Sequence, residues 1–80
     1  MRKVIEIKTP NRSRCKMFEP EFKKIQENHP EYEYEVLVFG ESEQASEYVR
    51  KYSIRSAPTF IVINGEEEKV VKQEELAESL

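Results

Sequence analysis

The sequence predicts an α/β fold with the element order βαβαββα, built as a single domain over residues 1–80. A β-branched, apolar run follows Pro58 and stops at Asn64-Gly65, the strongest short signal for a hairpin. Upstream, two strand-like segments are each followed by a segment with helical spacing of apolar residues. Two strands joined by a helix run parallel, whereas a hairpin is antiparallel. We therefore expect a four-stranded mixed sheet flanked by helices on both faces.

The first half of the chain supplies a strand, a helix and a second strand. Residues 3–8 are rich in β-branched side chains, and turn-forming residues follow them. Over residues 13–28, apolar side chains recur at helical spacing: Phe18, Phe22 and Ile25. Pro20 lies within this helix and should kink it or remove one backbone hydrogen bond. Residues 32–39 begin with strict alternation and end fully apolar, as a strand that enters the core from its edge does.

The second half begins with a helix that Ser42 can cap and that extends to about Tyr52. Pro58 has no backbone N–H to donate to a hydrogen bond between strands, so we expect it to begin the third strand and not to lie inside it. After the hairpin, residues 67–71 form the returning strand, and residues 74–80 form a short closing helix.

The composition describes a small domain with a thin core. The chain has 80 residues, of which 38% are hydrophobic and 36% charged, with a net charge of −3. This charge does not favour nucleic acid or an anionic membrane, and no apolar run approaches membrane-spanning length. The single cysteine cannot form an internal disulfide, and no signal peptide is evident. We expect a monomer located in the cytoplasm.

Several local sequences resemble the thioredoxin family in its short, glutaredoxin-sized form. The segment from Arg14 to Pro20, RCKMFEP, is similar to the part of the family's CxxC motif that holds the second cysteine and the helix-kinking proline. Residues 51–59, KYSIRSAPT, resemble the loop that holds the family's cis-proline, and Asn64-Gly65 matches its hairpin turn. The resemblance implies a thioredoxin-like fold, a thiol or disulfide partner on a protein or peptide, and a buried acid at Glu6.

The chain departs from the family at its chemical centre. In the CxxC position the motif reads RSRC, so Arg12 stands where the family has its nucleophilic cysteine. A dithiol cycle needs one thiol to attack a substrate disulfide and another to resolve the mixed disulfide. With Cys15 alone, that cycle cannot close within one molecule.

Cys15 has two interpretations. A helix N-terminus stabilises a thiolate, and Arg12, Arg14 and Lys16 add positive charge that lowers a thiol pKa. Monothiol exchange is then chemically accessible. Alternatively, Cys15 is an inert buried thiol that only packs, which is the commoner role of a free cysteine and the one we favour.

The remaining site candidates also have two interpretations each. Ala57 and Pro58 can present free backbone groups to an extended peptide or a glutathione-like ligand. Ser13, between two arginines, either holds an anion at the helix start or acts as an N-cap. Glu6 is either a proton acceptor for Cys15 or an outward-facing strand residue. One histidine and one cysteine far apart in sequence give no metal-binding spacing, so we expect no metal.

Two functions remain open on these residues. The first is a protein related to thiol–disulfide oxidoreductases that is limited to monothiol redox through Cys15, with glutathione as a candidate ligand. The second is a redox-inactive binding module that grips a peptide or an anionic partner between residues 12–15 and the Pro58 loop. The missing cysteine favours the second function, and the otherwise family-like frame of the site keeps the first one open.

Overall fold

The computed structural model describes residues 1–10 and 13–80, and for residues 13–15 it describes the backbone alone. Its elements follow the predicted order, with one short 3-10 helix added before the last α-helix. Their bounds are β1 (Arg2–Lys8), α1 (Ser13–Asn28), β2 (Glu33–Val38), α2 (Glu43–Tyr52), β3 (Thr59–Asn64), β4 (Glu67–Lys72), η1 (Gln73–Glu75) and α3 (Leu76–Ser79).

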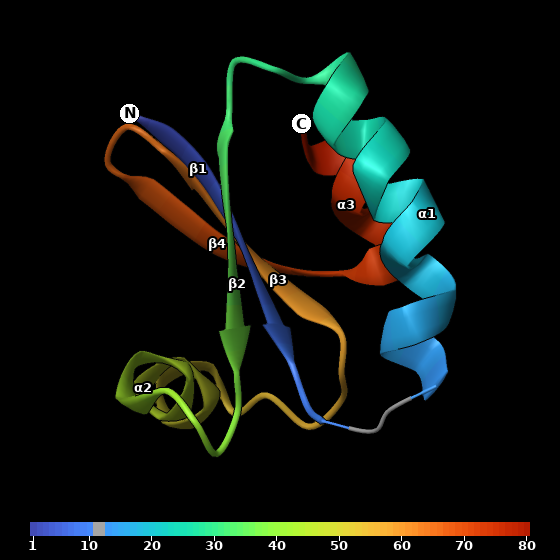
Figure 1. The fold of residues 1–80 in the computed structure, drawn as a ribbon. Coiled ribbons are helices and arrows are strands. Elements are labelled where there is room, and N and C mark those ends of the chain that lie inside the picture. The colour runs from blue at the N-terminus through green and yellow to red at the C-terminus, as the bar shows by residue number, and fades with distance from the viewer. Residues whose placement is uncertain (11–12) are drawn as a thin grey trace.

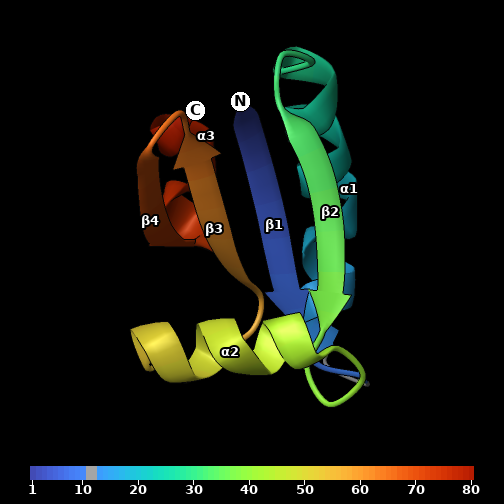
Figure 2. The ribbon, with the colours of Figure 1, turned by 90° about the vertical axis from the view of Figure 1, so that its left-hand side faces the viewer.

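The four strands form one mixed sheet with the order β2-β1-β3-β4. β1 pairs with β2 in parallel, and it pairs antiparallel with β3, which in turn pairs antiparallel with β4. Helices α1 and α3 lie on one face, and α2 crosses the other face near the end of the sheet at which β1 and β2 finish (Figures 1 and 2). The predicted fold class is confirmed.

Alternation along β1 divides the core into two layers, because successive side chains of a strand point to opposite faces. Val4 is fully buried towards α1 and α3, and Ile5 is 1% exposed towards α2. The layer under α1 and α3 is built around aromatic side chains, with Phe22 and Phe60 rings 5.2 Å apart. Its buried members are Val4, Phe18, Phe22, Ile25, Tyr32, Phe60, Val62, Val71 and Leu76.

The opposite face is covered by a helix of only ten residues, so long side chains complete its cover. The Tyr48 and Tyr52 rings stack with their centroids 6.3 Å apart and pack against the buried layer formed by Ile5, Ile7, Leu37, Ala45 and Ile61. The Tyr52 hydroxyl donates to the Glu68 carboxylate on β4, and Lys51 Nζ lies 2.8 Å from the same carboxylate. These contacts hold α2 across the sheet.

One sequence expectation needs adjustment. The closing helix does not span residues 74–80: the chain first turns as the 3-10 helix η1 and forms an α-helix only over Leu76–Ser79. Leu76 is fully buried, and the tighter turn before it carries the chain from β4 to the core in few residues. Helix α1 contains Pro20, in agreement with the range of 13–28 that the sequence predicts. Pro20 still lacks the N–H that would bond to the preceding turn.

Helix α2 ends at a residue in the left-handed conformation. Ser53 has φ 52° and ψ 46°, and its N–H donates to the Val49 carbonyl. The same carbonyl accepts from the N–H of Ile54 at 3.1 Å. This geometry turns the chain back towards the sheet, and it is the position at which helices most often carry glycine.

Replacing Ser53 with Gly should therefore raise the free energy of unfolding. Glycine removes the steric cost of the left-handed conformation, and part of the gain is offset by its larger entropy in the unfolded chain. The expected net gain is about 0.5–1 kcal/mol, measured by urea denaturation. The control Ser53→Ala keeps a Cβ and should give no gain. A loss of stability in Ser53→Gly would show that the serine side chain itself stabilises this turn.

Candidate functional site

The candidate site lies where the two parallel strands end. β1 finishes at Lys8 and β2 at Val38, and the Phe39 N–H donates to the Lys8 carbonyl at 2.8 Å. Because parallel strands end at the same edge of a sheet, Thr9 and Phe39 come to the same end of the molecule. Phe39 is 41% exposed, an unusual state for so large an apolar side chain next to a core strand.

The loop between α2 and β3 forms the other side of the site. The peptide bond between Ala57 and Pro58 is cis, and Pro58 is buried. The Thr59 hydroxyl donates to the Ser56 carbonyl at 2.6 Å, which fixes the backbone just before the strand. Pairing of β3 with β1 begins at Thr59, so the backbone groups of Ala57 lie outside the ladder.

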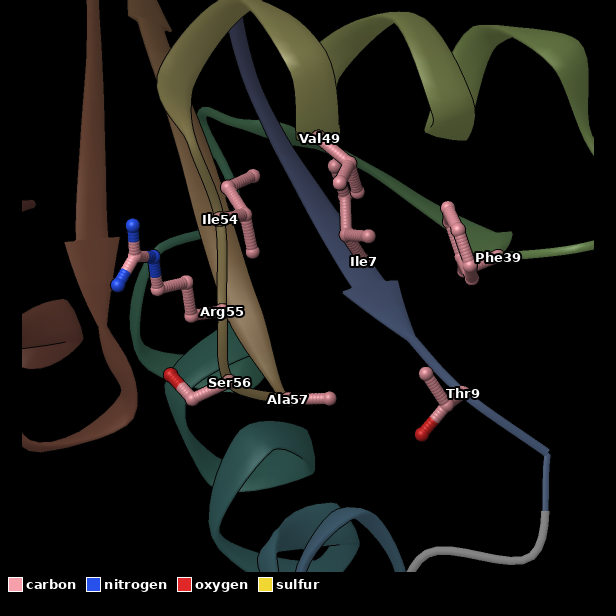
Figure 3. A pocket seen from close by; sticks show the side chains of 8 residues that line it. All are labelled: Ile7, Thr9, Phe39, Val49, Ile54, Arg55, Ser56 and Ala57. Atoms are coloured by element: carbon pink, nitrogen blue, oxygen red, sulfur yellow. The ribbon is translucent and has the colours of Figure 1, made fainter.

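Between these two segments lies a pocket of about 310 Å³. Figure 3 shows its wall: Val49 of α2 and Ile7 of β1 stand at one end, and Ser56 and Ala57 of the loop stand at the other. Most of the wall is apolar, and Arg55 is the one charged side chain among the described residues that line it. The lining residues are Ile7, Thr9, Phe39, Val49, Ile54, Arg55, Ser56 and Ala57.

The structure brings together only some of the predicted site residues. Ala57 lines the pocket and Pro58 lies next to it in the chain. Arg12 lies outside the described residues. Ser13, Arg14 and Cys15 form the first turn of α1, and their side chains are outside the described part of the chain. The proposed roles of these four residues are therefore untested.

Glu6 is buried on the helix α1 side of the sheet, which excludes the outward-facing alternative and leaves its role as a proton acceptor for Cys15 untested. It shares a face with Val4, pairs with Phe60 across the sheet, and is only 4% exposed. Burial raises the pKa of this carboxyl group above its usual value of 4.5, the positive charge of Lys8 opposes the shift, and the negative charge of Glu19 adds to it. The interaction with Glu19 agrees with a position beneath the first half of α1.

Comparison with known proteins agrees with this geometry. The family model described as Thioredoxin matches residues 2–80. This chain belongs to the thioredoxin family. No curated protein matches the chain. Two similar solved structures are the thioredoxin of Fasciola hepatica (22% identity, TM-score 0.77, covering 98% of this chain and 76% of that one) and that of Trypanosoma brucei brucei (21%, 0.80, 98% and 70%).

A third similar structure is the oxidised form of mitochondrial thioredoxin 3 from Saccharomyces cerevisiae, with 15% identity, a TM-score of 0.79, and coverage of 98% of this chain and 74% of that one. At these identities the structures support the fold alone. Thioredoxins with two active-site cysteines act by dithiol exchange, and this family member has a single cysteine in its 80 residues. It is thus related to thiol–disulfide oxidoreductases without carrying a CxxC motif.

Sequence reasoning missed most of the wall of this thioredoxin-family pocket, including Thr9, Phe39, Val49 and Ile54. A signal for the first two was present, since residues just beyond the carboxyl ends of parallel strands meet at one edge. Val49 and Ile54 had no such signal, because their apolar character is also typical of core packing.

Among the described side chains, no three histidine, cysteine, aspartate or glutamate residues gather where they could hold a metal ion. Within the described residues, no helix is long and apolar enough to span a membrane.

Replacing Glu6 with Gln should stabilise the protein at neutral pH and not at acidic pH. Because folding raises the pKa of Glu6, its contribution to stability is fully present below about pH 4.5 and is lost as the pH rises through the raised value. The glutamine side chain keeps the shape of the glutamate and cannot ionise. We expect the Glu6→Gln variant to unfold at higher urea concentration than the parent at about pH 7.5, with the difference vanishing near about pH 4.

The control for this experiment is Glu27→Gln, which changes an exposed glutamate of α1 and should leave stability unchanged at both pH values. If Glu6→Gln were destabilising at both pH values, the carboxylate would be held by favourable contacts, and burial would not dominate its energetics.

Proposed function

We propose that this protein binds extended segments of partner proteins at the Pro58 loop, as a binding module, and that any thiol chemistry it performs is limited to Cys15. The observation that carries the proposal is the apolar pocket of about 310 Å³ beside the Ala57–Pro58 bond. This volume accommodates one large apolar side chain of a peptide, and the backbone of Ala57 is available to pair with the peptide backbone.

Thr9 contributes a buried hydroxyl group to the wall of this pocket. Its hydroxyl oxygen is buried and has no hydrogen-bond partner among the described residues. An unsatisfied buried hydroxyl costs about 1–3 kcal/mol, and Thr9 lines the same pocket as Phe39 and Ala57 (Figure 3). The oxygen itself has no surface that a ligand in the pocket could reach. The polar groups that favour a peptide over a lipid chain are therefore the backbone groups of Ala57, which lie outside the ladder.

The test uses peptides of about twelve residues selected from a random display library on the immobilised protein. Phe39→Ala should weaken their binding about tenfold, because the side chain contributes exposed apolar surface at the pocket. Amide resonances of Thr9, Arg55 and Ala57 should shift on titration. The matched control is Val36→Ala, since Val36 is exposed to a similar degree (45% against 41%) but lies outside the pocket. Peptides that lose affinity through Val36 alone would overturn the assignment to the Pro58 loop.

Monothiol exchange is the second candidate function, supported by the backbone position of Cys15. It lies in the first turn of α1, where N–H groups lack helical acceptors, and this turn contains no acidic residue. The proposed step is attack of the Cys15 thiolate on one sulfur of oxidised glutathione. The glutathione disulfide breaks, a Cys15–glutathione disulfide forms, and the departing glutathione thiolate takes up a proton. A second glutathione thiol reverses the step.

This candidate predicts that the folded protein takes up one glutathione per chain from oxidised glutathione, with a thiol pKa below the free value of about 8.5. The rate of mixed-disulfide formation against pH gives both access and pKa, and the same rates in urea supply the reference for an unstructured thiol. A thiol that reacts only in urea would assign Cys15 to packing and leave the binding module as the sole function.

A further inference from the structure

The outer edge of β2 is open for backbone pairing. β2 is the terminal strand of the sheet and pairs only with β1 among the described residues. The Phe39 N–H faces β1, and successive residues of a strand direct their backbone groups to opposite edges. The backbone groups of Tyr34, Val36 and Val38 therefore face outwards. The Val38 carbonyl accepts from the N–H groups of Glu41 and Ser42, whereas the backbone groups of Tyr34 and Val36 have no partner in the described part of the chain.

The side chains along this edge differ between its two faces. Glu35 lies opposite Ile5 in the ladder and faces α2, as does Glu33. Val36 lies opposite Glu6 and faces α1, and it is 45% exposed. The edge thus presents carboxylates on one face and an exposed apolar side chain on the other. Tyr34 and Val36 each offer a backbone donor and a backbone acceptor to an added strand.

The other edge of the sheet, β4, lacks these features. It carries Glu67 and Lys69, charges of both signs, and contributes no large exposed apolar side chain to the described surface. Mixed charge is a common protection of strand edges against pairing. Among the described residues, the large exposed apolar side chains are Met1, Met17, Val36 and Phe39, and the last two belong to β2 or directly follow it.

The charge around β2 indicates what kind of strand could pair with it. Residues 31–49 contain no lysine or arginine and six glutamates, at positions 31, 33, 35, 41, 43 and 47. Glu35 forms an ion pair with Lys3, with 2.9 Å between Glu35 Oε1 and Lys3 Nζ. Glu33 is exposed and makes no such ion pair within the described residues. A second copy of the chain fits poorly, because antiparallel pairing of two β2 strands places the carboxylates of both copies on the same face.

We propose that the outer edge of β2 binds an extended basic segment of a partner protein, in which lysine or arginine alternates with apolar residues. Such a segment completes the backbone bonds of Tyr34 and Val36 as an added strand. Its basic side chains meet Glu33 and Glu35, and its apolar side chains cover Val36. This surface is separate from the pocket at the Pro58 loop, and it does not depend on the function proposed for that pocket.

The test uses a capped peptide of about eight residues that alternates lysine and valine. We expect it to slow hydrogen exchange of the Tyr34 and Val36 amides and to bind more weakly as salt rises. A peptide that alternates glutamate and valine should not bind. A lysine–valine peptide with N-methyl groups on alternate residues loses backbone donors on one edge, so it should bind about tenfold more weakly. These peptide controls leave the protein unchanged.

Two protein variants complete the test. Glu33→Lys should weaken binding about fivefold, while the matched control Glu66→Lys, an equal charge change at the hairpin between β3 and β4, should have a clearly smaller effect because two strands separate it from the outer edge of β2. Val36→Pro removes an outward N–H and should weaken binding without removing a bond to β1. The proposal is overturned if the N-methylated peptide binds equally well, if the exchange protection falls on Arg55 and Ala57, or if sedimentation shows that two copies pair through β2.

Discussion

The strict alternation of side chains along β1 is the constraint on which the rest of this domain depends. β1, like β3, has a helix-covered face on each side and pairing partners on both edges. Its odd-numbered residues therefore pack into the core layer under α2, and its even-numbered residues pack into the core layer under α1 and α3. This alternation fixes Glu6 on the α1 face, where hydrophobic neighbours surround it, so that an acid is buried in the apolar middle of the strand. A shift of one residue in the register would exchange both faces, so the pairing is strongly specified.

The two faces of the sheet are covered in different ways. The α1 face relies on aromatic packing, in which Phe60 contacts both Phe18 and Phe22. The α2 face is covered by one short helix, and a network of polar side chains joins this helix to β4. Lys51 holds the pKa of Glu68 below its usual value, with the Tyr52 hydroxyl adding to the effect. Lys51 is 62% exposed, so this ion pair contributes little to stability by itself. The ion pair instead helps to orient the stacked rings of Tyr48 and Tyr52 over the apolar layer beneath them.

The fold was predictable because each element carried its own local signal. Ser42 caps α2 by accepting from the Ala45 N–H, as its position before a helical pattern indicated. The hairpin turn lies one residue later than predicted, because Asn64 still pairs with Glu67 and the turn consists of Gly65, with φ 64°, and Glu66. The pocket was less predictable, because its walls come from segments that are distant in sequence. Thr9 and Phe39 meet only through the parallel pairing of β1 with β2. The face of Glu6 was ambiguous in the sequence because apolar residues stand on both sides of it, and only the ladder decides between them.

The two ends of the chain lie far from the pocket. In Figure 2 both termini stand at the end of the sheet opposite α2, and the Met1 carbonyl accepts from the Gly65 N–H at 2.8 Å, which ties the start of the chain to the hairpin. At the other end, Leu80 packs against the core layer under α1 and α3. A tether attached at either end through a flexible linker would therefore leave the Pro58 loop facing solution. The domain is thereby suited to display on a surface or to fusion with another protein, with its pocket directed away from the point of attachment.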